Sequence, residues 1–78
     1  MKSRNEAVER FGEKLRSLRK RHGMTLKELA QALGLNAHSH ISELESGKSK
    51  PTAEFAVKVA YLFNVSTDQL LMDELEVE

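Results

Sequence analysis

The sequence predicts an all-α fold, a compact bundle of five short helices in a single domain over residues 1–78. Three observations support this prediction. Apolar residues recur at helical spacing in five segments, a residue suited to capping a helix precedes each segment, and a glycine or another turn residue follows most of them. About 40% of the residues are hydrophobic, which is enough for a small core but too little to enclose a large pocket.

The first helix is expected to start at a possible capping box formed by Ser3 and Glu6 and to end near Gly23. Its apolar stripe consists of Val8, Phe11, Leu15 and Leu18. Basic residues crowd the same helix, and the chain as a whole has no net charge. Residues 1–27 carry a net charge of +6, whereas residues 66–78 carry −5. A domain with this asymmetry can present one basic face to phosphate.

The next two helices are predicted to be separated by a tight break. Thr25 and Glu28 have the spacing of a capping box, and an apolar face follows as far as Gly34, which tolerates the left-handed backbone that ends a helix. Asn36 is a suitable N-cap for the third helix, expected over about residues 36–46. Two helices joined so closely cross at a steep angle, and the second is pushed outward.

Pro51 and Thr52 are predicted to start the fourth helix and Asn64 to end it. Apolar residues cover most of the girth of this helix, which favours a central position in the bundle. Ser66 and Gln69 form another capping-box pattern at the start of the fifth helix.

The core is expected to lie within about residues 8–72, followed by an acidic tail over residues 73–78. Two interpretations of the tail remain open. It is either a frayed acidic end or a surface on which Leu71, Leu75 and Val77 meet a second subunit.

These motifs resemble the Xre/Cro/phage-repressor-type helix-turn-helix transcriptional regulator family. The resemblance covers roughly residues 8–72 and rests on Leu29-Ala30, Gly34, Ile41-Ser42, Leu44-Glu45, Gly47, Lys48, Pro51 and the segment Val65–Leu71. It implies a lambda-repressor-like DNA-binding domain that binds double-stranded DNA in a sequence-specific way, as a homodimer on a palindromic operator. It implies no enzymatic activity, no cofactor and no small-molecule ligand. Stand-alone members of this size include controllers of restriction-modification systems, phage-type repressors and antitoxins.

The third helix carries the expected base contacts. Six residues separate Gly34 from Ile41, where the usual family pattern has five. Counting back from Ile41 places the base-reading positions on His38 and Ser39, with Glu43 one turn further on, whereas counting forward from Gly34 favours Ala37 and His38. Short polar side chains near the start of such a helix can read base edges in the major groove. The predicted base contacts are Ala37, His38, Ser39, Ser42 and Glu43.

Phosphate contacts are expected on both sides of this helix, where they would set its register on the duplex. The predicted contacts are Thr25, Lys27, Ser46, Lys48 and Lys50. Thr25 is included because free N–H groups at a helix start suit an anion. In the family a glutamine often follows the cap of the second helix and clamps a phosphate. Leu26 occupies that position here, and Lys27 is a possible replacement.

The resemblance also implies one structural ion pair, between Arg19 on the first helix and Glu45 near the end of the third. This pair would tie the two helices together and would not contact DNA. If it is partly buried, breaking it from one side costs more than breaking a surface pair.

Several classes of function are disfavoured. The chain has no cysteine, and His22, His38 and His40 lack the spacing of metal ligands. No apolar run is long enough to span a bilayer, and no catalytic motif is present. We expect a cytoplasmic, nucleoid-associated protein. The rival interpretation is a protein-interaction module of the antitoxin or adaptor type that keeps this fold with weak or no DNA binding. The zero net charge, Glu43 and Glu45 near the groove, and Leu26 in place of glutamine favour it.

Overall fold

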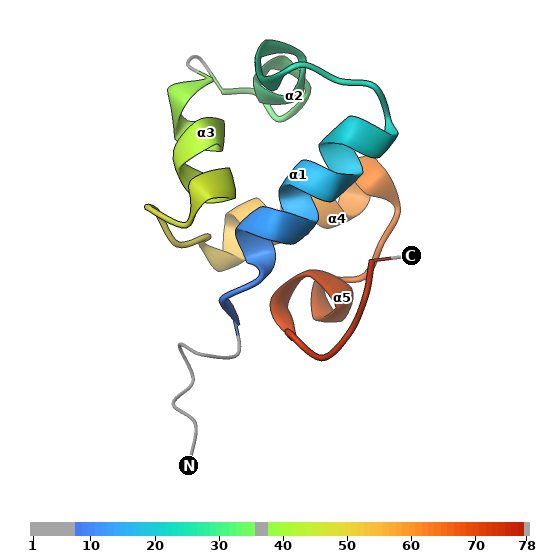
Figure 1. Ribbon diagram of the computed structural model, residues 1–78. Helices are drawn as coiled ribbons and strands as arrows, with labels where there is room; N and C mark the ends of the chain where they lie inside the picture. The colour runs from blue at the N-terminus through green and yellow to red at the C-terminus, as the bar shows by residue number, and fades with distance from the viewer. Residues whose placement is uncertain (1–7, 36–37, 78) are drawn as a thin grey trace.

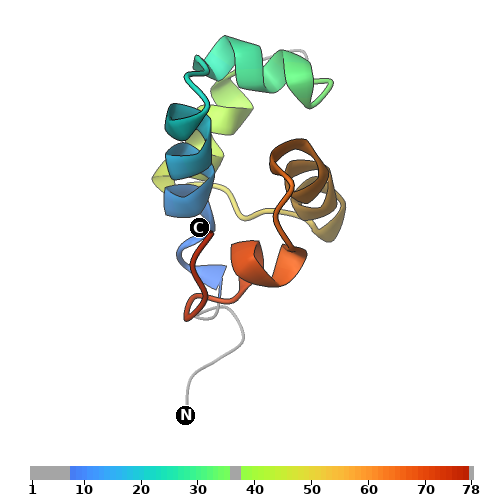
Figure 2. The same ribbon diagram turned by 90° about the vertical axis from the view of Figure 1, so that its right-hand side faces the viewer.

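The computed structural model describes residues 8–35 and 38–77 and has five α-helices. They are α1 (Phe11–Arg21), α2 (Leu26–Ala32), α3 (Ser39–Ser46), α4 (Ala53–Phe63) and α5 (Thr67–Leu71). No strand occurs among the described residues, so the predicted all-α class and the five helices are confirmed. Figure 1 shows α1 across the middle with α3 at one side. Figure 2 shows α1 and α4 on opposite sides, with α2 and α5 at the two ends.

The core is built mainly from one face of each helix. Its buried apolar side chains are Phe11, Leu15, Leu18, Leu29, Ala30, Leu33, Ile41, Leu44, Phe55, Ala56, Val59, Ala60, Phe63, Leu70 and Val77. Gly12 lets α1 approach α3 closely, because a Cβ atom at this position would overlap the backbone oxygens of Leu44 and Glu45. This close approach fixes α3 against the rest of the bundle.

Three helices begin with the side-chain caps that the sequence predicts. The Thr25 hydroxyl accepts a hydrogen bond from the Glu28 N–H at 3.0 Å, while the Glu28 carboxylate accepts one from the Thr25 N–H at 2.8 Å. Ser66 and Gln69 form the same reciprocal box at the start of α5. The Thr52 hydroxyl caps α4 by accepting from the N–H of Phe55 at 3.1 Å. Each cap satisfies backbone N–H groups that have no partner inside the helix.

The helix ends also follow the predicted turn residues. Gly34, Gly47 and Asn64 adopt positive φ angles of 77°, 84° and 56° just after α2, α3 and α4. Asn64 is the one residue besides glycine with a positive φ in the described part of the chain. Asparagine tolerates this left-handed conformation better than most residues, so it can end α4 where glycine ends the other two.

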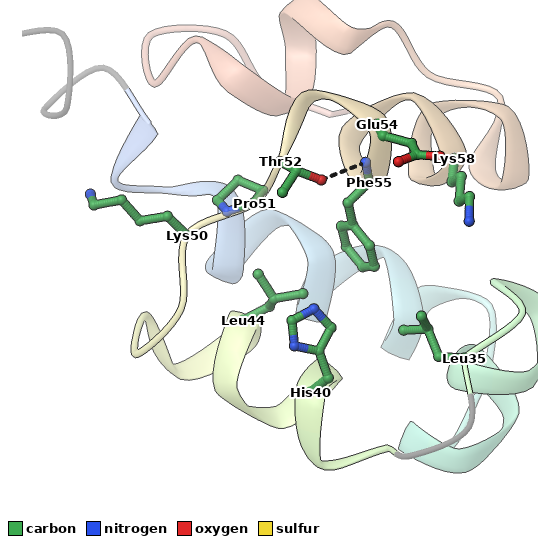
Figure 3. A pocket seen from close by; sticks show the side chains of 9 residues that line it. All are labelled: Leu35, His40, Leu44, Lys50, Pro51, Thr52, Glu54, Phe55 and Lys58. Carbon is green, nitrogen blue, oxygen red and sulfur yellow. Dashed lines mark hydrogen bonds between the residues drawn. The ribbon is translucent and has the colours of Figure 1, made fainter.

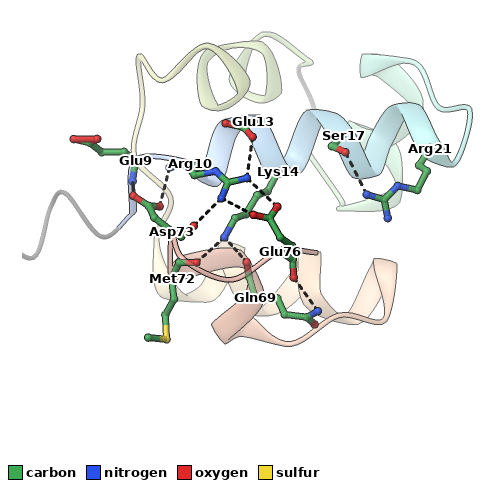
Figure 4. Close-up of polar contacts among 10 residues, drawn as sticks. All are labelled: Glu9, Arg10, Glu13, Lys14, Ser17, Arg21, Gln69, Met72, Asp73 and Glu76. Carbon is green, nitrogen blue, oxygen red and sulfur yellow. Dashed lines mark hydrogen bonds and ion pairs between the residues drawn. The ribbon is translucent and has the colours of Figure 1, made fainter. Parts of the chain in front are cut away.

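The predicted start of α1 is wrong. Ser3 and Glu6 lie outside the described residues, and α1 begins only at Phe11, with Arg10 at the N-cap and no cap from its side chain. The cap comes from the other end of the chain. The Asp73 carboxylate accepts hydrogen bonds from the backbone N–H groups of Glu9 and Arg10 at 3.1 and 3.0 Å (Figure 4).

The third helix is also shorter than predicted. It starts at Ser39, and His38 is the N-cap without a capping hydrogen bond from its side chain. Asn36, the predicted cap, lies outside the described residues. The helix α3 therefore covers the last 8 residues of the predicted range.

The acidic tail is not frayed over residues 73–77. Besides Asp73, Glu76 is bound to this end of α1, since both of its carboxylate oxygens lie 3.0 Å from the Arg10 guanidinium nitrogens (Figure 4). Val77 is buried in the core of its own chain, with 6% of its surface exposed. The expectation that Val77 contacts a second subunit is therefore wrong as well.

Lys14 is the most completely buried charged residue among the described residues, with 1% of its surface exposed. Its ammonium donates hydrogen bonds to the backbone oxygens of Gln69 and Met72 at 2.6 and 2.7 Å. Desolvation by burial lowers the pKa of Lys14 below its ordinary value. The buried lysine thus ties α1 to the end of α5.

The fourth helix is not central in the bundle, although apolar residues cover most of its girth. Phe55, Val59 and Phe63 point into the core, whereas Val57, Tyr61 and Leu62 remain exposed. One side of α4 therefore faces out of the bundle, on the side opposite α1 (Figure 2).

Candidate nucleic-acid interface

The third helix lies at the edge of the bundle (Figure 1), and its polar residues are exposed on one side. Its two large apolar residues, Ile41 and Leu44, are fully buried. Most of the side chains between and before them point outward because a helix repeats every 3.6 residues. The outward residues are His38, Ser39, Ser42 and Glu43, and all are exposed.

Four of the five predicted base contacts belong to this polar side. His38 and Ser39 lie at its N-terminal end, and Ser42 and Glu43 follow one turn later. Ala37 lies outside the described residues. The Glu43 carboxylate accepts a hydrogen bond from the Ser49 hydroxyl at 3.3 Å, which turns it toward the loop after α3.

His40 differs from its neighbour His38 in the direction of its ring. The ring lies 5.9 Å from that of Phe55 in an edge-to-face arrangement. Figure 3 shows His40 and Phe55 facing each other in a hollow between α3 and α4, with Lys50 and Lys58 at its two ends. His40 is therefore directed toward α4, which leaves His38 as the histidine of the outward polar side.

The ion pair that the resemblance implies holds α3 to α1. Arg19 donates two hydrogen bonds to the Glu45 carboxylate, from Nε at 2.7 Å and from Nη2 at 3.1 Å, and a third to the Met24 backbone oxygen at 2.9 Å. The side chains of Arg19 and Glu45 are 12% and 8% exposed. The hydrogen bonds to Glu45 raise the pKa of Arg19. Because its charge is matched by Arg19, Glu45 does not act as a free anion beside α3.

The predicted phosphate contacts differ in how free their polar groups are. Lys27, Lys48 and Lys50 are exposed and form no ion pair with any described residue. The Ser46 hydroxyl donates to the Glu43 backbone oxygen at 3.1 Å but remains exposed. The Thr25 N–H donates to the Glu28 carboxylate and the Thr25 hydroxyl accepts from the Glu28 N–H, so the hydroxyl O–H is the donor that this residue keeps.

A further basic residue, which the sequence analysis did not select, lies at this surface. Arg16 is exposed, and it lines an open hollow at the junction of α1, α2 and α3 together with Leu26, Ser42 and Ser46. Leu26 is the position where the family often has a phosphate-binding glutamine. The spacing contained a signal, because Arg16 stands three residues before Arg19 and so shares one face of α1 with it.

A family model described as helix-turn-helix matches residues 15–70, most of the chain. This chain belongs to the helix-turn-helix family of transcriptional regulators. The matched range runs from α1 to α5 and includes α2 and α3 with their connection. The resemblance drawn from the sequence motifs is thereby confirmed.

Individual relatives of this helix-turn-helix protein are also transcriptional regulators. An uncharacterised HTH-type transcriptional regulator of Archaeoglobus fulgidus is 36% identical over 59 residues, which cover 76% of this chain and 83% of that protein. The HTH-type transcriptional regulator SinR of Bacillus subtilis is 34% identical over 69 residues, covering 87% of this chain but 61% of SinR. The chain therefore spans less than two thirds of SinR.

Two solved structures have the same arrangement of helices. The N-terminal DNA-binding domain of SinR from Bacillus subtilis has a TM-score of 0.76 and 32% identity, over 87% of this chain and 99% of that domain. The restriction-modification controller protein C.AhdI from Aeromonas hydrophila has a TM-score of 0.70 and 27% identity, over 85% of this chain and 97% of that protein.

Membership of this helix-turn-helix family has two consequences. Its members are transcriptional regulators and not enzymes, which agrees with the prediction that this chain has no catalytic activity. The family binds double-stranded DNA. In addition, none of the described helices has the length and apolar character needed to cross a membrane.

Proposed function

We propose that this protein is a sequence-specific regulator of transcription that binds double-stranded DNA as a homodimer on a palindromic operator, with α3 in the major groove. The observation that carries the proposal is the exposed polar side of α3, bounded by the cations Arg16, Lys48 and Lys50. A regulator of this kind would act in the cytoplasm, associated with the nucleoid through its DNA.

The geometry of α3 suits the major groove, which is about 12 Å wide and admits one α-helix. The side chains that would meet base edges are His38, Ser39, Ser42 and Glu43, and Ala37 is retained as a candidate from the sequence. A His38 ring nitrogen can donate to guanine, and the Glu43 carboxylate can accept from cytosine if it releases Ser49.

The proposed phosphate contacts surround this helix on three sides. Lys48 and Lys50 follow α3 in the chain, with Ser46 at its end. Lys27 belongs to α2, and Arg16 reaches the same surface from α1. Thr25 remains a weaker member of the set because its N–H donates within its own capping box, which leaves only its hydroxyl as a donor. We propose that Arg16 binds the phosphate that, elsewhere in the family, is bound by a glutamine at the position of Leu26.

Two copies are needed because one α3 helix can read only a few base pairs. A two-fold dimer would place two α3 helices about 34 Å apart, one helical turn of DNA. Selection of bound sites from a random duplex pool tests this directly. We expect a palindrome with half-sites separated by about one turn, whereas recovery of no common sequence would contradict the proposal.

Substitutions separate base contacts from phosphate contacts. His38→Ala should change preference at one base pair by about 1–3 kcal/mol, whereas Lys50→Ala should weaken binding about equally on all sequences. Arg16→Ala should behave like Lys50→Ala. Arg21→Ala is the matched control, because it removes the same charge from α1 on the side where Arg21 donates to Ser17. Equal losses for the variants at 16 and 21 would show a general charge effect and not a contact.

A salt titration distinguishes DNA binding from the rival role of a protein-interaction module. Affinity for duplex DNA should fall steeply as salt rises, because phosphate contacts release counterions. Exposed Glu43 and the apolar Leu26 still favour the rival. Glu45 no longer does, since it is paired with Arg19. Binding that is absent or insensitive to salt would support the interaction module.

A further inference from the structure

The outer side of α4 carries an apolar surface that the DNA-binding role does not use. Val57, Tyr61 and Leu62 have 44%, 85% and 37% of their surfaces exposed. Val57 and Tyr61 are one turn apart on the same side of the helix, and Leu62 flanks this side beyond Lys58. Single exposed apolar residues are common, whereas a group of them around an exposed tyrosine marks a contact surface.

This surface has a ridge between two hollows. Tyr61 forms the ridge, because it lines both hollows and is the most exposed of the large apolar residues. The hollow toward α5 is also lined by Val57, Val65 and Thr67. The hollow toward the end of α2 is also lined by Leu33, Lys58 and Leu62. We call Tyr61 and these two hollows the α4 face.

We infer that the α4 face binds the α4 face of a second copy of this chain, with Tyr61 of each copy in a hollow beside Tyr61 of the other. A two-fold contact requires the same patch to complement itself, and a projecting ring next to a recess meets this requirement. This inference rests on the proposed function, because binding to a palindromic operator requires two copies. It adds the surface through which the two copies meet.

Two charges at the α4 face also suit a second copy. Glu54 and Lys58 stand one turn apart on α4 (Figure 3), and Lys58 lines the hollow toward the end of α2. Both are exposed, and neither forms an ion pair with a described residue. Across a two-fold axis, an acid and a base on one patch offer each other reciprocal partners.

The position of the α4 face leaves α3 free. The outer side of α4 is turned away from α1 (Figure 2), whereas α3 occupies a different edge of the bundle (Figure 1). Docking through the α4 face therefore covers neither the polar side of α3 nor Arg16. The alternative surface in the tail, formed by Leu71, Leu75 and Val77, is less suitable, because Val77 is buried and Leu71 is half-buried within the chain.

The size of the apolar centre indicates a weak dimer. An exposed tyrosine and two partly exposed aliphatic side chains can bury on the order of 300 Å² per copy, against roughly 800 Å² per partner in a standard interface. We therefore expect the free protein to be in equilibrium between monomer and dimer in the micromolar range, and a two-site operator to draw two copies together.

Sedimentation equilibrium of the full chain tests the inference without DNA. The wild type should dimerise as concentration rises, and Tyr61→Lys should raise the dissociation constant at least about tenfold. Leu75→Lys is the control, because Leu75 is an apolar residue of the tail with the same exposed fraction as Leu62, 37%. It should dimerise like the wild type. Circular dichroism checks that the variants fold, and Val57→Lys provides a second disruption of the α4 face.

Three outcomes would overturn the inference: a wild type that stays monomeric up to about 1 mM, a Tyr61→Lys variant that dimerises normally, or a Leu75→Lys variant that alone loses dimerisation. Binding to a duplex with a single half-site separates this inference from the proposed function. Tyr61→Lys should keep the half-site affinity and lose cooperative binding to the palindrome. If no variant and no wild type binds DNA, the proposed function fails while the sedimentation result still decides the dimer.

Discussion

Replacing Glu45 by alanine tests how strongly the ion pair between α1 and α3 holds the DNA-facing helix. In the intact protein the Glu45 carboxylate accepts hydrogen bonds from Arg19 at 2.7 and 3.1 Å. After the substitution, the guanidinium stays largely buried and keeps one partner, the Met24 backbone oxygen at 2.9 Å. The perturbation therefore leaves a poorly solvated charge with most of its hydrogen bonds unmade.

The expected cost follows from the burial of the pair. Breaking a fully buried pair from one side costs about 3–5 kcal/mol, whereas an exposed pair contributes about 0–1 kcal/mol. Arg19 and Glu45 are 12% and 8% exposed, and one hydrogen bond of Arg19 survives. We therefore expect Glu45→Ala to lower the free energy of unfolding by about 2–4 kcal/mol, a large part of the stability of a small domain.

Urea unfolding followed by circular dichroism measures this loss. Glu13→Ala is the matched control, because Glu13 pairs with Arg10 on the same helix but is 66% exposed. It should cost less than about 1 kcal/mol. Raised salt should reduce the effect of Glu13→Ala more than that of Glu45→Ala, since buried pairs are screened less. If Glu45→Ala costs no more than the control, the pair is not what holds α3 against α1.

Three further predictions concern the packing, the caps and the acidic tail. Gly12→Ala should destabilise the protein by about 3 kcal/mol or more in thermal or urea unfolding, because the added Cβ overlaps the Leu44 backbone oxygen; a neutral result would mean that α1 and α3 separate easily. Ser66→Ala should cost about 1 kcal/mol by removing the cap of α5, and an unchanged stability would show that α5 needs no cap. The hydrogen bond from Arg10 lowers the pKa of Glu76 in the folded state, so its stabilising effect is present above the unfolded pKa of about 4.3 and is lost as pH falls through the folded value. Glu76→Gln should therefore flatten the acid side of the stability curve measured by urea midpoints, and an unchanged slope below about pH 4.3 would contradict this.

The features that the sequence predicts well are those formed by residues close in the chain. The capping box of Thr25 with Glu28 depends on residues three positions apart, and so does the cap that Thr52 provides to Phe55. Local hydrogen bonds of this kind form wherever the helix forms. The alternation of buried and exposed positions on α3 is equally local, because the buried residues Ile41 and Leu44 recur at helical spacing.

The candidate site was predictable only in part, because side-chain direction depends on the neighbouring helices. The sequence offers His38 and His40 as similar polar residues two positions apart. Only the structure shows that the ring of His40 meets Phe55 on α4. The role of Arg16 was missed for the same reason, since the hollow that it lines with Leu26 exists only once α1 and α2 have packed together.

The contacts of the tail were not predicted from the sequence, because they join two helix ends that are distant in the chain. Neither of these ends is capped by a side chain of its own helix. The N-terminus of α1 receives the Asp73 carboxylate from the segment after α5, and the C-terminus of α5 receives the Lys14 ammonium from α1. Each contact joins residues more than fifty positions apart, so no local sequence pattern predicts either contact. Both contacts are stabilised by the helix dipoles, because an anion lies at an N-terminus and a cation at a C-terminus. Acidic residues after α5 that look like a solvated end are therefore part of the fold, and they hold α1, the helix against which α3 is fixed.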